Sequence, residues 1–357
     1  MPKHWHYKNL RWLYLALAVL ELIAVEVPGV RDYRLSPYAG YELGAESAND
    51  FNSDFLIPRV IGQVRPGSPA DRAGLQPGDQ TLSVAGIPFE DQKRIIELGR
   101  PQIGETRAIV VQRGEERLLL NVTYEKNPAS YDLKYSAFAV IAFAFLGAGT
   151  ICFWFYPGSS TSLLFWLGLT GAFVFMHKPY LNSFAARSAF AMLRWFITSL
   201  WLAFLLHFLL IFPKPKRILT TRPWLARFVL YLPCLLLFLI IAYYTARPSR
   251  LIGGGESVIN FAFLFIGAYL VLGVAAFIHT YLTMLKSERT RGMKIMAVGT
   301  AIGILPIAVS IITLIAAPQI KLPGRDYYIL TLVFIPLCFA FGVWERMSAG
   351  QRRPATS

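Results

Sequence analysis

The chain has 357 residues, of which 55% are apolar and only 16% are charged, and its mean hydropathy is +0.46. Soluble domains usually carry about 25% charged residues, so this composition excludes an ordinary soluble protein and predicts a membrane protein. The formal net charge is +14. Residues 29–133 carry 12 Lys and Arg against 15 Asp and Glu, so the basic charge belongs to the apolar remainder. There it is expected to orient spans, and no nucleic-acid partner is predicted.

Eight segments are long and apolar enough to be read as transmembrane helices. In chain order they are 10–27, 135–156, 162–176, 188–212, 228–246, 258–285, 293–317 and 327–343. With the N-terminus inside, this arrangement leaves 15 Lys and Arg on the cytoplasmic side and 7 in the outer loops. The asymmetry follows the positive-inside rule, so both termini are expected in the cytoplasm and membrane lipid around the bundle.

The first span has two interpretations. Lys3, Lys8 and Arg11 precede an apolar run, as in a secretory signal peptide, but Glu21 interrupts the run and residues 25–30 contain no small-x-small cleavage site. An uncleaved signal anchor is therefore favoured over a cleaved peptide. The expected divisions are an N-terminus and anchor at 1–28, an exported domain at 29–133, seven helices at 134–345 and a short basic tail at 346–357.

The three cysteines, Cys152, Cys234 and Cys338, all lie in predicted spans. The exported segment has no cysteine, so a disulfide framework is excluded there. No Cys/His spacing typical of a metal site occurs, and neither a metal nor a cofactor is expected.

Residues 68–86 predict a short capped helix, a tight turn and a strand in succession. Ser68 is a suitable N-cap with Pro69 at the first helical position, and Gly74 can supply the left-handed residue that ends a short helix. Pro77 and Gly78 fit the centre of a type II turn. Residues 80–84 then alternate as a half-buried strand should.

These residues resemble a known family. The stretch "GSPADRAGLQPGD", followed by "LSVAG" and by "AIVVQRGEERLLLNV", is similar to bacterial PDZ domains of HtrA-type and C-terminal processing proteases. The resemblance covers residues 36–125 and implies an α+β fold, a small, partly open β-barrel with two helices. It departs at Ala85, where the family commonly has Asn, and at Gln80 and Thr81, where apolar residues are usual.

The resemblance also implies a task, which is to bind the C-terminus of a peptide or protein as an added strand. "PYAGYEL" fits the carboxylate loop and the strand after it, with Tyr38, Gly40, Tyr41 and Leu43. A helix at 89–98 would form the other wall, with Ile95 and Leu98 as pocket residues. Simple core packing of that helix is an equally weighted alternative.

The helical half offers two further observations. "LLHFLLIFPKPKR" at 205–217 is similar to the multi-spanning input regions of bacterial sensor histidine kinases, but no kinase follows residue 345, so an output partner in the membrane or cytoplasm is expected. Glu21 and Arg194 are predicted at similar depths and could form an intramembrane ion pair. Gly299 and Gly303 are spaced for a close helix contact.

An enzymatic function is not expected from the sequence. His-Glu-x-x-His is absent, which argues against a site-2 metalloprotease, and Gly158-Ser159-Ser160 is placed in a loop, unlike the serine of a rhomboid protease. The favoured function is a membrane receptor or signalling adaptor of the bacterial inner membrane whose periplasmic or extracellular PDZ domain couples to seven helices. The alternatives are a transporter-like bundle that uses the domain for assembly and an intramembrane protease.

Overall fold

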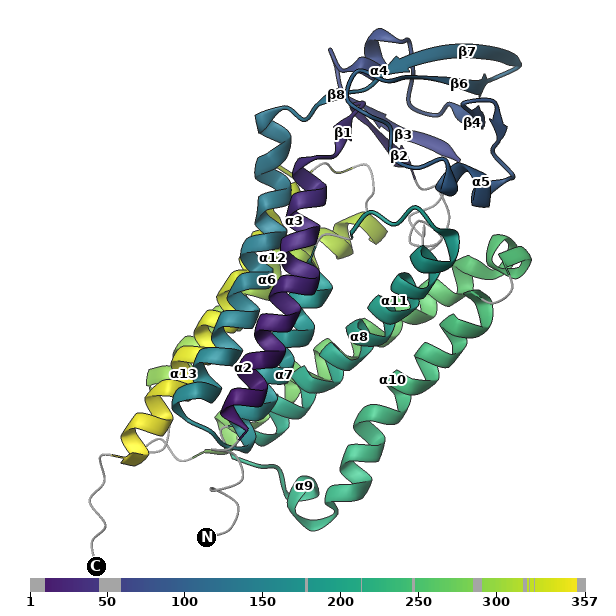
Figure 1. Ribbon diagram of the computed structural model, residues 1–357. Coiled ribbons are helices and arrows are strands. Elements are labelled where there is room, and N and C mark those ends of the chain that lie inside the picture. Colours follow the sequence, from purple (N-terminus) through teal and green to yellow (C-terminus); the bar gives the residue numbers. More distant parts are fainter. Residues whose placement is uncertain are drawn as a thin grey trace, which may run out of the picture.

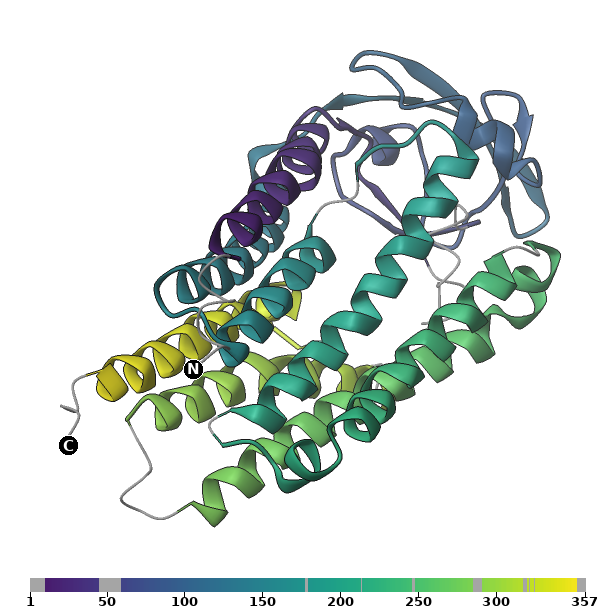
Figure 2. The same ribbon diagram turned by 60° about the horizontal axis from the view of Figure 1, so that its bottom comes forward.

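The computed structural model describes residues 10–44, 59–176, 179–212, 214–245, 248–284, 291–316, 320, 322–323 and 325–351. It has two parts, a small domain of strands and short helices at residues 37–126 and a bundle of long helices (Figure 1). The small domain follows the first helix of the bundle in the chain and lies at one end of the bundle (Figure 2).

The first helix is continuous but not uniform. It runs through α2 (Arg11–Glu21), a π-helical turn η1 (Leu22–Glu26) and α3 (Val27–Arg34). The predicted span ended at residue 27, whereas the helix continues to Arg34 and reaches the small domain. The predicted domain boundaries at 29 and 133 therefore fall inside helices, because α6 begins at Ala129.

The small domain is built on one main sheet and one short strand pair. The main sheet has the order β2-β3-β4-β6-β7, with β5 beside β4, and β1 pairs with β8. The strands are β1 (Pro37–Tyr38), β2 (Tyr41–Gly44), β3 (Val60–Val64), β4 (Gln80–Val84), β5 (Ile87–Pro88), β6 (Thr106–Arg113), β7 (Glu116–Thr123) and β8 (Glu125–Lys126). The pairings are antiparallel.

Two short helices cover this sheet, α4 (Pro69–Arg72) and α5 (Gln92–Glu97). The predicted cap is confirmed, because the Ser68 hydroxyl oxygen accepts a hydrogen bond from the Asp71 N–H at 3.2 Å. The predicted strand at 80–84 is β4. The domain core consists of Ala39, Ile61, Ala70, Leu75, Ile109, Val111, Val122 and Tyr124.

The bundle is formed by the remaining helices together with the first. They are α6 (Ala129–Phe155), α7 (Ser159–Phe175), α8 (Phe184–Ile211), α9 (Arg217–Thr221), α10 (Pro223–Thr245), α11 (Pro248–Thr283), α12 (Arg291–Ala316), the 3-10 helix η4 (Arg325–Val333) and α13 (Phe334–Gln351). Each of the eight predicted apolar segments is largely helical. Gly158-Ser159-Ser160, which was predicted in a loop, instead straddles the start of α7.

Several of these helices have the length and composition that a membrane crossing requires. Within the described residues they are Arg11–Asp32, Ser136–Phe155, Phe184–Ile211, Leu264–Thr283 and Tyr327–Ser348. Two shorter apolar helices are Ser159–Phe175 and Arg227–Tyr243. These findings allow a transmembrane bundle and leave the number of crossings as a prediction.

The bundle is held together by aromatic packing and by close helix approaches at glycines, among them the two predicted glycines of α12. Phe145, Phe165 and Phe208 are at most 1% exposed. Gly303 of α12 lies so close to α13 that a Cβ there would stand 2.7 Å from Ile335 Cγ1, and a Cβ at Gly299 would overlap the Cys338 side chain. The predicted contact at these two glycines is therefore confirmed.

The ends of the bundle are distinct. The end of α3, the start of α6 and the connection between α7 and α8 lie beside the small domain (Figures 1 and 2). The start of α2, α9 and the end of α13 lie at the opposite end (Figure 1).

Candidate functional site

The loop between β1 and β2 is fixed by the segment that leads into α4. Gly40 has a φ of +81°, and a Cβ at this position would overlap the side chain of Ser68. Its carbonyl accepts a hydrogen bond from the Arg65 N–H, and the Ala39 carbonyl accepts one from the Ala70 N–H, both at 2.8 Å. Only glycine satisfies both the backbone angle and the space, so the sequence at this loop is dictated by geometry.

A cavity of about 410 Å³ opens between the edge strand β2 and helix α5. Tyr41 lines it from β2, and Ile95 and Ile96 line it from α5. Its floor reaches the domain core at Ile61 and Ile109. A concave, mainly apolar site of a few hundred Å³ with a small number of polar groups is the usual form of a ligand pocket.

The polar groups of the cavity are held in place. The Tyr41 and Tyr124 hydroxyl oxygens are 3.4 Å apart, and burial raises the pKa of both tyrosines. Arg107 is 9% exposed, and it donates from Nε to Glu105 at 2.7 Å and from Nη1 to the Gly99 carbonyl at 3.0 Å. Among the polar groups that the PDZ domain contributes are therefore the ordered Arg107 guanidinium and the hydroxyls of Tyr41 and Tyr124, within a mainly apolar lining.

The helical bundle contributes to the same cavity. Tyr180 and Leu181, from the connection between α7 and α8, and Arg187 of α8 also line it. Helix α5 contacts α8 directly. The cavity is thus closed on one side by residues more than 50 positions away in the chain from the strands that form its floor.

The structure separates the predicted site residues into two groups. Tyr41 and Ile95 line the cavity, whereas Tyr38 and Gly40 shape the loop without lining it. Leu98 is 38% exposed and outside the lining, and the side chain of Leu43 lies outside the described residues. Sequence reasoning missed Arg107 of β6, Tyr124 between β7 and β8, and the three residues of the bundle.

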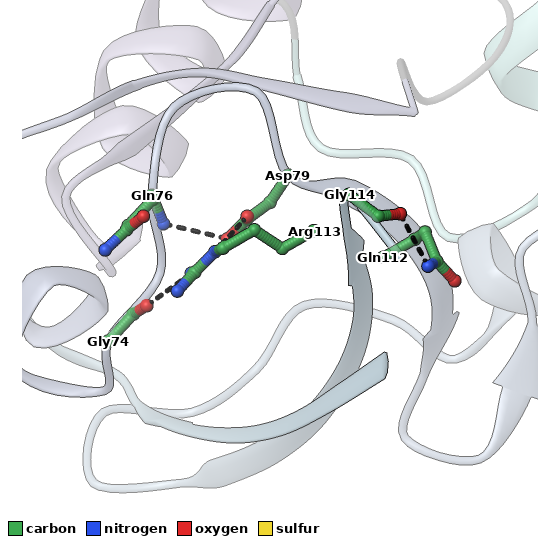
Figure 3. A network of polar contacts seen from close by, with 6 residues as sticks. All are labelled: Gly74, Gln76, Asp79, Gln112, Arg113 and Gly114. Atoms are coloured by element: carbon green, nitrogen blue, oxygen red, sulfur yellow. Dashed lines mark hydrogen bonds and ion pairs between the residues drawn. The ribbon is translucent and has the colours of Figure 1, made fainter. Parts of the chain in front are cut away.

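An ion pair between the buried Asp79 and the partly exposed Arg113 stabilises the turn that precedes β4 (Figure 3). The Asp79 side chain is 1% exposed and accepts hydrogen bonds from Arg113 Nε at 2.7 Å, Arg113 Nη2 at 2.8 Å and the Gln76 N–H at 2.8 Å. Burial opposes the charged form of Asp79, but these hydrogen bonds outweigh it and lower the pKa of the carboxyl group. Arg113 also donates to the Gly74 carbonyl at 2.7 Å, so this network ties the turn after α4 to β6.

The predicted ion pair of Glu21 with Arg194 is not formed, which corrects that expectation. Arg194 Nη2 donates to the Val174 carbonyl at 3.3 Å. Glu21 and Glu26 are 9% and 0% exposed, their carboxylate oxygens accept no hydrogen bond from a donor in the described part of the chain, and the two carboxyl groups lie close enough to interact with each other. The Val174 carbonyl, on the adjacent helix α7, gives Arg194 a nearer acceptor than Glu21. Among the described residues, no three His, Cys, Asp or Glu side chains converge as a metal site would require.

Comparison with known proteins identifies the small domain. A family model for the PDZ domain matches residues 60–113. HhoA of Synechocystis sp., named as a serine protease, is 34% identical over 109 residues, which cover 26% of this chain and 27% of HhoA. A DegP-like protein of Hahella chejuensis, named as a periplasmic serine endoprotease, is 38% identical over 77 residues, or 21% of this chain and 16% of the relative.

The HtrA-type protease AlgW with a decapeptide matches at 24% identity and a TM-score of 0.21, over 32% of this chain and 35% of AlgW. The chain spans about a quarter or less of the length of the curated relatives named above.

The relatives correct one expectation from the sequence. No enzymatic activity was expected, whereas the related proteins are named as serine proteases and point to protease activity. The matches are confined to the PDZ region. The fold, the confirmed cap and strand, and these matches together lead to one assignment: residues 37–126 of this chain form a PDZ domain of the HtrA/DegP type.

Proposed function

We propose that this protein is a membrane-embedded peptide-binding protein of a proteolytic system, in which the PDZ domain captures the C-terminal segment of a peptide or protein. PDZ domains bind such segments as an added strand beside an open sheet edge. The names of the related proteases favour a role in proteolysis.

The observation that carries the proposal is the cavity beside β2. In the main sheet, β2 is the first strand in the order and pairs only with β3 among the described strands. An extended peptide laid along the edge of β2 that faces away from β3 would place alternate side chains over the cavity between Tyr41 and Ile95. The N–H groups at Gly40 would meet the terminal carboxylate.

The proposal includes an orientation in the membrane. The bundle would span the bacterial inner membrane eight times, with both chain ends in the cytoplasm and the PDZ domain on the periplasmic or extracellular side. Two features support this orientation, the excess of Lys and Arg in the segments assigned to the cytoplasm and the position of α9 at the end of the bundle away from the PDZ domain. Peptide capture outside the membrane would then be coupled to the helices and to an output partner.

The test uses the full chain in detergent and fluorescein-labelled hexapeptides of the sequence Gly-Ser-Gly-Ser-Gly-X, where X is Phe, Leu, Val or Ala. At least one peptide with a free C-terminus should bind, and amidation should weaken binding by about 1.5–3 kcal/mol, because the amide loses the charge that the loop N–H groups stabilise.

The matched variants are Ile95→Asp and Ile103→Asp. Ile95 is 7% exposed and lines the cavity, whereas Ile103 is 58% exposed and lies outside it. The first substitution should abolish binding and the second should leave it unchanged. Mass spectrometry of the bound peptides reports whether the chain cleaves them. If no peptide binds, or if amidation makes no difference, peptide capture by the C-terminus is wrong.

A further inference from the structure

The peptide cavity is formed by two parts of the chain that fold far apart in sequence. The PDZ domain supplies the floor and the α5 wall, including Ile95 and Tyr124. The facing residues Tyr180 and Leu181 come from the connection between α7 and α8, and Arg187 comes from the first turn of α8. An isolated PDZ domain would lack these three residues.

The wall from the bundle is anchored in two directions. The Tyr180 N–H donates to Asp32 Oδ2 at 3.0 Å, and Asp32 lies on α3 at the end of the first helix. Arg100, which follows α5, donates from Nη1 to the Asp32 carbonyl at 2.9 Å and lies over the Tyr180 ring with its guanidinium carbon 4.4 Å from the centroid. The PDZ domain, the first helix and the α7–α8 connection therefore meet at these three residues.

These contacts hold the α7–α8 connection at a defined position relative to the PDZ domain. Tyr180 is held through its backbone and its ring at once, so Leu181 is presented to the cavity from a fixed position. A wall that is already ordered before the ligand arrives loses little conformational entropy on binding, which favours affinity.

We infer that the helical bundle forms part of the peptide site, so that the terminal side chain of a bound peptide packs between Ile95 of the PDZ domain and Leu181 of the α7–α8 connection. This inference rests on the proposed peptide binding. The ligand class is a peptide whose last residue is large and apolar, because Ile95, Phe89 and Leu181 form an apolar lining on both sides.

The first test measures affinity with the same hexapeptides and the full chain. Leu181→Asp should weaken the peptide that ends in Phe or Leu by about tenfold or more, because a carboxylate would replace an apolar contact of the terminal side chain. Asn182→Asp is the matched control, since Asn182 is exposed, adjacent in sequence and outside the lining. It adds the same charge and should have little effect.

The second test does not depend on the stability of a variant. A hexapeptide with a benzophenone-bearing residue at its C-terminus is bound to the unmodified full chain, irradiated and digested. Labelling should fall on α5 and also on residues 179–187.

The outcomes separate this inference from the proposed function. If Ile95→Asp abolishes binding while Leu181→Asp behaves like Asn182→Asp and labelling stays within the PDZ domain, peptide capture stands and the shared wall is wrong. Tighter binding in Leu181→Asp also overturns the inference, because the α7–α8 connection would then obstruct the groove. Failure of every peptide to bind overturns both proposals.

Discussion

Arg100 of the PDZ domain and Tyr180 of the helical bundle stack on each other, with 4.4 Å between the guanidinium carbon and the ring centroid. Both residues also donate hydrogen bonds to Asp32. The Arg100 guanidinium donates to the Asp32 backbone carbonyl, and the Tyr180 N–H donates to the Asp32 carboxylate. Such a cation–π contact contributes about 0.5–1 kcal/mol at an exposed site. The position of the domain on the bundle therefore depends on a few polar residues as well as on apolar packing.

Asp32→Ala should loosen the α7–α8 connection. The Tyr180 N–H would lose a charged acceptor worth about 1.5–3 kcal/mol, so its hydrogen exchange should accelerate by roughly tenfold or more. Arg31→Ala is the control. The Arg31 side chain is 74% exposed, and its ion pair with Asp32 is long, with 4.0 Å between Nε and Oδ1, so its loss should change little. Equal exchange rates in the two variants would show that Asp32 does not hold this connection.

Asp79→Asn should destabilise the PDZ domain by about 1.5–3 kcal/mol, because the amide loses the charge-assisted hydrogen bonds from Arg113, whose side chain is 31% exposed and still reaches solvent. Pulse proteolysis of the full chain in increasing urea measures this free energy of unfolding. Glu125→Gln is the comparison, since its ion pair with Arg72 is half-exposed on both sides and should contribute at most about 0.5 kcal/mol. Similar losses in the two variants would contradict the role assigned to Asp79.

The same carboxyl group predicts a pH dependence. Its folded pKa is lowered, so its stabilisation is complete above the unfolded pKa of about 3.9 and is lost as the pH falls from there through the lower folded pKa. The wild-type domain should lose stability more steeply than Asp79→Asn over this acidic range. Parallel pH profiles would mean that other carboxyl groups account for the acid sensitivity.

Gly40→Ala should prevent the β1–β2 loop from closing on α4. The added Cβ overlaps the Ser68 side chain and sits at a φ of +81°, so the cost should exceed the roughly 1–2 kcal/mol of the backbone angle alone. Gly67→Ala isolates the angle, because Gly67 has a φ of +73° and nothing within 4 Å of a Cβ. Urea-dependent proteolysis that gives the same loss for both would refute the steric argument.

Ala85→Asn should stabilise the domain. Ala85 has a φ of +50° in the turn between β4 and β5, and Asn tolerates this left-handed region better than other residues that carry a Cβ. We expect a gain of about 0.5–1 kcal/mol from Ala85→Asn and a loss from the β-branched Ala85→Val. The same proteolysis assay ranks the two variants, and the opposite order would contradict the explanation.

Glu21→Gln and Arg194→Gln should act independently on the stability of the solubilised chain. Arg194 bonds to the Val174 carbonyl, and Glu21 lies beside the carboxyl group of Glu26, so no direct interaction links Glu21 to Arg194. Thermal unfolding of the single and double variants forms the required cycle. A coupling energy above about 1 kcal/mol would restore the ion pair that the sequence predicted.

The sequence by itself determined the features that depend on neighbouring residues. The cap at Ser68, the strand at 80–84, the apolar helices and the contact at Gly299 and Gly303 could all be predicted, because each follows from local backbone preferences or from a periodic pattern. Tyr41 and Ile95 could be placed at the peptide groove through the resemblance of a short motif to PDZ domains. In that family the groove lies between a strand and a helix, and the two residues fall on these elements.

Only the tertiary structure decided how the two halves meet. Leu181 and Arg187 join Ile95 at one cavity although no periodicity relates them, since their proximity depends on the lengths of α3 and α7 and on the tilt of helices that the sequence does not encode locally. The partner of Arg194 was decided in the same way, because a carbonyl on an adjacent helix lay nearer than a carboxylate at the same expected depth. Contacts between side chains of distant elements depend on how all the elements pack together, and this packing is a property of the tertiary structure.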